Sequence, residues 1–226
     1  MPYYDDIVFD LDGTLMDPKS EILSAARYAL QRFQIENPDP EKLNQFLVRP
    51  LLRCFEEEFG LNTQQTEQAF KYYWHYAGSF GLRQNKCYEG VPELLKTLKE
   101  QNRDIHIATA REVRHAKTFL KAQNLYHLFS IVLGPSTSEV ELRQTKKIIL
   151  FDVLCGIDEG VSGDNTHEHI VMVGDRTNDI LAAKDNGVDS IGVTYGQDSP
   201  EKIKEAEPTY IADSIQELSD ILLSND

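Results

Sequence analysis

The chain of 226 residues contains 37 acidic and 23 basic side chains, so its formal charge at pH 7 is −14. Hydrophobic residues make up 41% of it, enough to build a folded core, which argues against disorder despite the charge. The acidic balance disfavours nucleic acid polymers and anionic membranes as partners, because both repel such a surface. No apolar run approaches the roughly 18 residues of a membrane span, and the acidic N-terminus does not resemble a signal peptide. We therefore expect a soluble, cytoplasmic protein.

Short β-rich runs alternate with helical patterns along most of the chain. Strands separated by crossovers of helix length predict a parallel sheet with helices on both faces, so the expected fold class is α/β with a doubly wound parallel sheet. The expected strands are 7–9, 105–108, 131–133, 170–173, 190–193 and 210–211. The expected helices of this part are 91–98, 113–120, 142–154, 177–186 and 215–222. The polar stretch 156–169 has no period and is expected to form a surface loop.

From residue 17 to residue 86 the sequence shows only helical periodicity and no convincing strand. Asp17-Pro18 is typical of a helix start, with a cap residue followed by proline at the first helical position. Further helices are expected at 51–59 and 63–80. We therefore predict an α/β core domain of residues 1–16 and 87–226, interrupted after its first strand by an all-helical domain of residues 17–86.

The expected first strand runs directly into two carboxylates, in the motif DxDGT formed by residues 10–14. In an open parallel sheet, ligands bind beyond the carboxyl ends of the strands, so Asp10 and Asp12 should project into that crevice. Two such acids can divide the chemistry, one as a nucleophile or metal ligand and the other as a proton donor. The alternative is an ordinary Asp-Gly turn, but a buried strand seldom ends in unpaired acids without a function.

A second apolar strand, 170–173, is followed by Asp175 and Asp179. If a helix begins between these two acids, Asp175 lies at the strand tip and Asp179 lies about one turn into the helix. Taken alone, the pattern fits a helix N-terminus with a first-turn acid almost equally well. Together with Asp10 and Asp12, however, it would form a cluster of four carboxylates, which needs a hard cation such as Mg2+ to be stable.

Four segments in this order resemble the motifs of one known superfamily. They are DxDGT after the first strand, Thr109 after the second, a lysine ahead of a later helix, and GDRxxD after the fourth strand. In these the sequence resembles the haloacid dehalogenase superfamily, and its segments 85–92 and 191–196 are similar to the phosphoglycolate phosphatase-like branch. The helical insert resembles the cap domain of that superfamily. The resemblance implies a Mg2+-dependent phosphatase that acts on a small phosphorylated metabolite.

The resemblance also implies roles for individual residues. Asp10 would attack the phosphorus and form an aspartyl phosphate, while Asp12 would protonate the leaving alcohol and later accept a proton from water. Mg2+ would be held by Asp10, the backbone carbonyl of Asp12 and Asp175, with support from Asp179. Thr109 would hold the phosphoryl oxygens.

Lys146 and Lys147 both fit the position of the lysine that the superfamily carries ahead of this helix. We assign the role to Lys146 because this branch often carries the lysine directly after Ser or Thr, and Thr145 precedes it here. Many relatives have a proline after this lysine, which this chain lacks. At the second strand end, Ala110 and Arg111 also depart from the usual pattern, and we interpret Arg111 as the polar start of the next helix, with a phosphate contact as the alternative.

Substrate binding is assigned to Thr14, in the DxDGT motif, and to Arg49 in the expected helical domain. The guanidinium of Arg49 could bind a second anionic group of the substrate, but an exposed loop arginine is an equally good interpretation. A phosphomutase would use the same residues, and a non-catalytic phosphate-binding regulator is a further alternative. The sequence specifies neither the phosphate ester nor the oligomeric state.

Overall fold

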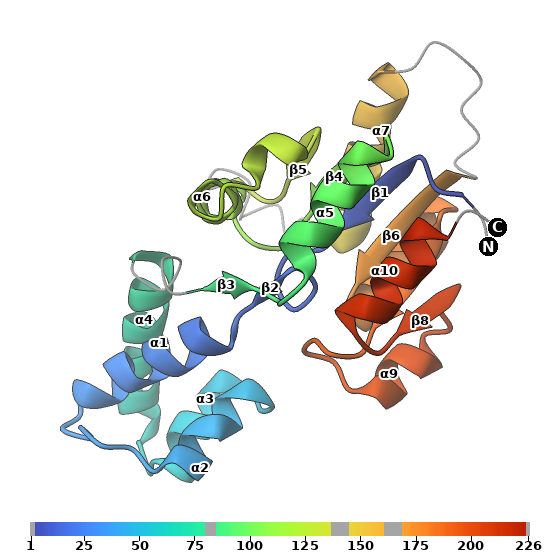
Figure 1. Cartoon of the computed structure of the whole chain (residues 1–226). Helices are drawn as coiled ribbons and strands as arrows, with labels where there is room; N and C mark the ends of the chain where they lie inside the picture. The colour runs from blue at the N-terminus through green and yellow to red at the C-terminus, as the bar shows by residue number, and fades with distance from the viewer. Residues whose placement is uncertain (1–2, 80–84, 137–144, 161–168, 225–226) are drawn as a thin grey trace. The chain divides into compact units, whose positions relative to one another are not determined.

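The computed structural model describes residues 3–79, 85–136, 145–160 and 169–224, and its centre is a six-stranded parallel sheet (Figure 1). The strand order is β5-β4-β1-β6-β7-β8, and every neighbouring pair is parallel. The strands are β1 (Asp6–Phe9), β4 (Asp104–Ala108), β5 (Ile131–Leu133), β6 (Ile170–Gly174), β7 (Asp189–Val193) and β8 (Tyr210–Ala212). This arrangement confirms the expected doubly wound α/β fold.

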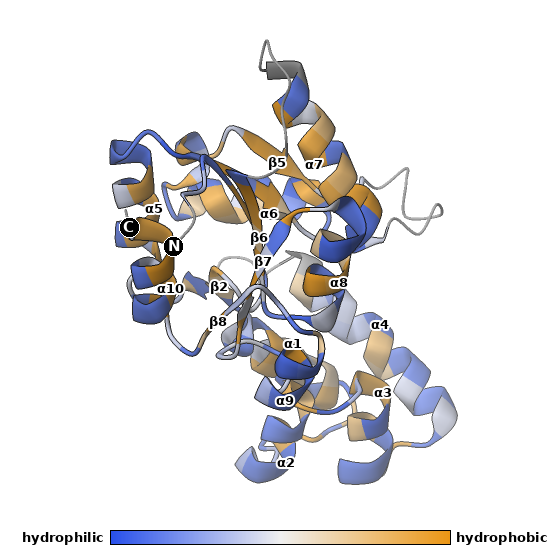
Figure 2. Ribbon diagram, turned by 90° about the vertical axis from the view of Figure 1, so that its right-hand side faces the viewer, coloured by the Kyte–Doolittle hydropathy of each residue, from blue (hydrophilic) through white to orange (hydrophobic). Residues whose placement is uncertain are grey.

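Helices cover both faces of the sheet. Successive residues of a strand point to opposite faces, and the central strands carry apolar side chains on both. Ile7 and Phe9 pack with α5, α6 and α10 in one apolar cluster, whereas Val8 packs with α7 and α8 in another. Both sides of the central strands are therefore buried, and these strands are coloured as hydrophobic in Figure 2. The helices are α5 (Val91–Glu100), α6 (Val113–Ala122), α7 (Lys146–Gly160), α8 (Thr177–Asn186), α9 (Pro200–Glu205) and α10 (Ile215–Leu223).

Helix α7 differs from its predicted bounds. It continues to Gly160, so the first residues of the predicted loop 156–169 are helical. The reason is that Ile157 is buried and extends the apolar face formed by Val153 and Leu154. Residues 142–144 of the predicted helix and residues 161–168 of the predicted loop lie outside the described residues.

The chain forms two compact units, one of Met1–Asp17 with Cys87–Asp226 and the other of Pro18–Lys86. The second unit is helical, and its core contains the small residues Ala25, Ala26 and Ala29, which let α1 pack closely on α4. Its elements are α1 (Lys19–Gln31), α2 (Pro40–Asn44), a 3-10 turn (Gln45–Leu47), α3 (Leu51–Arg53), a π-helical turn (Cys54–Glu58) and α4 (Thr63–Ser79).

A two-stranded sheet of β2 (Met16–Asp17) and β3 (Lys86–Cys87) carries the chain out of the α/β unit and back. Because Asp17 belongs to β2, α1 begins at Lys19, and the preceding Pro18 makes no side-chain capping bond. The helix therefore begins one residue later than predicted, with Pro18 at the cap position and not at the first helical position.

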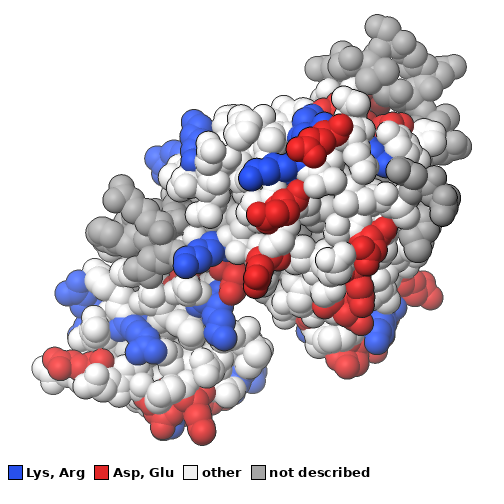
Figure 3. All heavy atoms as spheres, in the orientation of Figure 1, with Lys and Arg blue, Asp and Glu red and all other residues white. Residues whose placement is uncertain are grey.

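Acidic and basic side chains are interspersed over the face of the molecule drawn in Figure 3. Part of the acidic surplus does not reach the surface at all, because Asp10, Asp175 and Asp179 are buried. The net charge of −14 thus combines a mixed surface with a buried cluster of acids. Among the described residues, no helix combines the length and the apolar character that crossing a membrane requires.

Candidate active site

The sheet brings three distant strand ends together. Chain order runs outward from β1 through β4 to β5, and then resumes on the other side of β1 with β6, β7 and β8. Ligands of open α/β sheets bind at such a reversal, beyond the carboxyl ends of the strands. Asp10 follows β1, Thr109 follows β4 and Asp175 follows β6, so all three lie at this edge.

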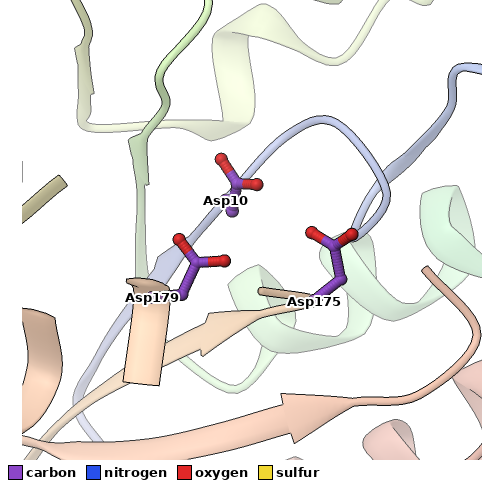
Figure 4. Close-up of side chains that lie close together, drawn as sticks. All are labelled: Asp10, Asp175 and Asp179. Carbon is purple, nitrogen blue, oxygen red and sulfur yellow. The ribbon is translucent and has the colours of Figure 1, made fainter. Parts of the chain in front are cut away.

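Three carboxylates gather at the reversal point (Figure 4). Asp10, Asp175 and Asp179 are buried, and one carboxylate oxygen of each lies within 4.8 Å of the others. Asp179 belongs to the first turn of α8, where its carboxylate accepts a hydrogen bond of 3.0 Å from the backbone N–H of Arg176. The helix start expected between Asp175 and Asp179 is therefore present, and it directs the second acid toward the first.

The glycine of the DxDGT motif allows this close approach. Gly13 has a φ of +90°, which L side chains rarely adopt. A Cβ added at Gly13 would lie 2.1 Å from Oδ2 of Asp175. Any larger residue at this position would displace the Asp175 carboxylate or the turn that follows β1.

Lys146 supplies the positive charge closest to these acids. Its Nζ donates hydrogen bonds to Oδ1 of Asp10 at 2.6 Å and to the Ala108 carbonyl at 2.9 Å, and it lies 2.9 Å from Oδ1 of Asp179. Burial disfavours the ammonium, but the charges of Asp10 and Asp179 outweigh this effect and raise the pKa of Lys146. The side chain of Lys147 is instead 55% exposed and pairs with Asp185. The structure thus brings Lys146, and not its neighbour, to the carboxylates.

Burial disfavours the charged forms of these acids, and the single ammonium of Lys146 does not balance three carboxylates. Burial raises the pKa of Asp10 to about 8; Lys146 opposes this rise, whereas the charges of Asp179 and Asp175 add to it. Burial likewise raises the pKa of Asp175 to about 6. Three buried carboxylates facing one ammonium provide hard oxygen donors of the kind that Mg2+ prefers. The residues present therefore fit a divalent cation of this class.

Asp12 lies differently from the other acids of the motifs. Its carboxylate does not belong to the group of three and is instead held by Arg111, whose Nη2 lies 2.7 Å from Oδ1. The backbone carbonyl of Asp12 accepts a hydrogen bond of 3.1 Å from Nε2 of Gln197. The backbone N–H of Gln197 also donates to Asp175 at 2.7 Å, so this residue supports two of the predicted metal ligands.

Arg111 and Gln197 are site residues that the sequence did not assign. The role of Arg111 could have been predicted from the sequence, because this residue lies two positions after Thr109 at a strand end already expected to face the site. Neither interpretation of Arg111, as the polar start of α6 or as a phosphate contact, included its contact with Asp12. Gln197 carries no such signal, since its contacts depend on β7 lying beside β6.

The hydroxyls of Thr14 and Thr109 are both fully buried. The Thr14 hydroxyl donates to Oδ1 of Asp175 at 3.2 Å, so it supports that carboxylate. The substrate contact predicted for Thr14 stays a prediction. The Thr109 oxygen accepts a hydrogen bond of 3.1 Å from the backbone N–H of Arg111 at the edge of the sheet where the acids lie, and its own proton can serve as a donor.

Arg49 belongs to the helical unit, and its guanidinium pairs with two acids of the same unit, Glu57 and Glu58. The side chain is 30% exposed. Arg49 is thus a partly exposed arginine that is paired within its own unit, and the substrate contact predicted for it stays a prediction. A substrate anion would have to compete with the two glutamates.

Comparison with known proteins assigns the chain to a family. The model of the haloacid dehalogenase-like hydrolase family matches residues 7–193. The chain is 33% identical to a 5'-nucleotidase of Pseudomonas aeruginosa, across 98% of this chain and 97% of that protein. It is 31% identical to a phosphoglycolate phosphatase of Mannheimia succiniciproducens, across 96% and 97% of the two chains. A crystal structure from Clostridium difficile, provisionally assigned as a phosphatase, matches with a TM-score of 0.86 and 35% identity, covering 99% of this chain and 100% of that one. This chain therefore belongs to the haloacid dehalogenase-like hydrolase family and is a phosphatase.

Proposed function

We propose that the phosphatase depends on Mg2+ and hydrolyses the monoester of a small phosphorylated metabolite through an aspartyl phosphate formed on Asp10. The observation that carries this proposal is the buried group of Asp10, Asp175 and Asp179 around Lys146, at the point where the sheet reverses its order. A buried carboxylate that faces two others and one ammonium is placed for a reaction with an anionic ester, and has no evident structural use.

In the first half of the proposed reaction, an oxygen of Asp10 forms a bond to phosphorus while the bond from phosphorus to the ester oxygen breaks. The electron pair of that bond leaves with the ester oxygen, which receives the proton of the Asp12 carboxyl group. Asp10, Asp175 and the Asp12 carbonyl would hold Mg2+ with support from Asp179, and the bound ion would offset the repulsion between the Asp10 carboxylate and the phosphate.

In the second half, the Asp12 carboxylate takes a proton from water as the water oxygen bonds to phosphorus. The bond from phosphorus to Asp10 breaks, its electron pair returns to the carboxylate, and inorganic phosphate is released. Lys146 keeps Asp10 oriented by its bond of 2.6 Å and offers charge to the phosphoryl oxygens. We assign the Thr109 hydroxyl, at the end of β4, as a further donor to these oxygens.

We further propose that the helical unit Pro18–Lys86 is a cap domain that selects the ester. The similar proteins carry different substrate names, 5'-nucleotidase and phosphoglycolate phosphatase, although they match this chain over almost its whole length. We therefore place the selection of the ester outside the acids of the site. In this chain the cap carries Arg49, which a substrate with a second anionic group could draw away from Glu57 and Glu58.

Hydrolysis of p-nitrophenyl phosphate by the purified chain tests the proposed function. We expect phosphate release with Mg2+ and its loss after chelation with EDTA, restored by added Mg2+. A panel of metabolite monoesters, including nucleoside monophosphates, phosphoglycolate and sugar phosphates, then ranks substrates by kcat/KM. Phosphate must appear in solution at the rate of substrate loss, because an isomeric sugar phosphate without free phosphate would identify a phosphomutase. Absence of hydrolysis across the whole panel would contradict the proposal.

Binding of Mg2+ should release protons and tighten as the pH rises. Because the pKa of Asp10 is raised to about 8 and that of Asp175 to about 6, the free protein holds protons that the ion must displace at pH 7. We expect the affinity to increase by up to about tenfold per pH unit between pH 6 and pH 8 and to level off above that range. Isothermal titration calorimetry in buffers of different ionisation enthalpy counts the protons. An affinity that does not change over this range would contradict the assignment of Asp10 as a ligand.

The same pKa shifts contribute to the stability of the protein in EDTA. A carboxyl group whose pKa is higher in the folded than in the unfolded chain binds more protons when folded, so the contribution of Asp10 to stability falls as the pH rises from about 4 to about 8. Added Mg2+ should reverse this fall at pH 8. The Asp10→Asn variant is the matched control, because it should show a smaller pH dependence of the melting temperature.

A further inference from the structure

Arg111 makes the most extensive contact of any described side chain with the Asp12 carboxylate. Its Nε lies 2.8 Å from Oδ2 and 3.1 Å from Oδ1, and its Nη2 lies 2.7 Å from Oδ1. The side chain of Arg111 is 14% exposed and that of Asp12 is 22% exposed. Exposed ion pairs contribute little, but a largely buried guanidinium that binds both oxygens of a carboxylate restricts its orientation strongly.

The backbone that carries Arg111 is itself fixed. Its N–H donates to the Thr109 hydroxyl at 3.1 Å, and two residues later the N–H of Val113 donates to the Pro135 carbonyl at 2.9 Å. Gly134 packs so closely on this turn that an added Cβ would lie 2.6 Å from the Arg111 carbonyl oxygen. The guanidinium therefore extends from a turn anchored by the strand ends of β4 and β5.

We propose that Arg111 is a positioning residue that holds the Asp12 carboxylate on the β4 side of the site, apart from the cluster of Asp10, Asp175 and Asp179. The inference rests on the proposed function, in which the Asp12 carboxyl group must meet the ester oxygen. A carboxylate two residues from Asp10 could otherwise turn toward the acids and their cation, because carboxylate oxygens are good ligands for Mg2+. Each carboxylate oxygen has more than one lone pair, so the contact with Arg111 leaves capacity to carry and transfer a proton.

Comparing esters with different leaving groups distinguishes this positioning role from a general loss of structure. An alkoxide leaves slowly unless the acid protonates it, whereas p-nitrophenolate leaves readily without help. For Arg111→Ala we expect kcat/KM for an alkyl phosphate to fall about 10–100-fold, and kcat/KM for p-nitrophenyl phosphate to fall less than about threefold. The ratio kcat/KM is the right quantity, because it reports the steps up to the aspartyl phosphate and excludes its hydrolysis. Arg111→Met, which retains the apolar stem, should behave in the same way and guards against a folding defect in the alanine variant.

Two controls complete the experiment. Arg114→Ala removes an arginine that is 72% exposed on the same helix and pairs with Glu112, so it should leave both esters unaffected and account for the loss of charge alone. In an Asp12→Asn background, Arg111→Ala should add little further loss, because the group that it positions is gone.

The outcomes distinguish this inference from the proposed function. If the unaltered chain hydrolyses neither ester, the proposed function fails and this inference fails with it. If it hydrolyses both, and the Arg111 variants lower both equally or not at all, the proposed function stands and the positioning role is wrong.

Discussion

Replacing Asp10 with asparagine should abolish the hydrolysis of phosphate monoesters, with a fall in kcat on the order of 10^4-fold or more. The amide oxygen is a poor nucleophile, so no covalent bond to phosphorus can form. The loss is not expected to come from unfolding, because asparagine has the same shape and its carbonyl oxygen can still accept the hydrogen bond from Lys146. Steady-state rates and mass spectrometry of the acid-quenched protein measure the two consequences, namely loss of turnover and loss of the phosphorylated species.

The melting temperature of the Asp10 variant shows whether lost turnover comes from the missing nucleophile or from unfolding. Burial raises the pKa of Asp10 to about 8, which means that its charged form is unfavourable in the folded, metal-free protein. We therefore expect the melting temperature of Asp10→Asn in EDTA at pH 8 to equal or exceed that of the unaltered chain. Asp5→Asn is the matched control, an exposed acid just before the opposite end of β1 that should leave turnover unchanged. Turnover of more than a few per cent in the Asp10 variant would exclude this residue as the nucleophile.

Removing the Lys146 ammonium should damage both stability and turnover. Lys146→Ala leaves Asp10 and Asp179 as buried acids without their cation, and breaking a buried ion pair by removing one partner costs about 3–5 kcal/mol. The loss should be larger at pH 8 than at pH 5, because protonation of Asp10 below its raised pKa of about 8 removes the charge that Lys146 balances. Urea unfolding in EDTA at the two pH values measures the difference.

Lys147 offers a control one residue away. Its side chain is 55% exposed and pairs with Asp185 on α8, so Lys147→Ala should change the free energy of unfolding by less than about 0.5 kcal/mol. We also expect it to retain full turnover, whereas Lys146→Met, which keeps the volume of the stem without the charge, should lose about 100-fold or more in kcat. Equal losses of kcat and of stability on replacing Lys146 and Lys147 would contradict the site as described.

Local patterns were sufficient to predict the framework of the fold. Each of the six strands of the main sheet was expected within about one residue at either end, because a buried parallel strand is a short apolar run bounded by polar residues. The short helix α9 was not predicted, since its six residues contain only Ile203 as a buried apolar anchor. The predicted strand ends also placed Asp10, Thr109 and Asp175 at the same edge of the sheet, since the carboxyl ends of parallel strands share an edge.

What the sequence determined by itself was therefore the type of fold, the strand ends and the acids that follow them, all of which depend on residues close together in the chain. The tertiary structure decided how these groups are paired. Lys146 reaches Asp10 across 136 positions and Arg111 reaches Asp12 across 99, so both contacts depend on strand order. The choice between Lys146 and Lys147 depends on the phase of α7, in which one residue turns the side chain by about 100°. Thr14 donates to Asp175, and Arg49 pairs with Glu57 and Glu58, because the fold brings these side chains together. The spacing of residues in the sequence did not indicate either contact.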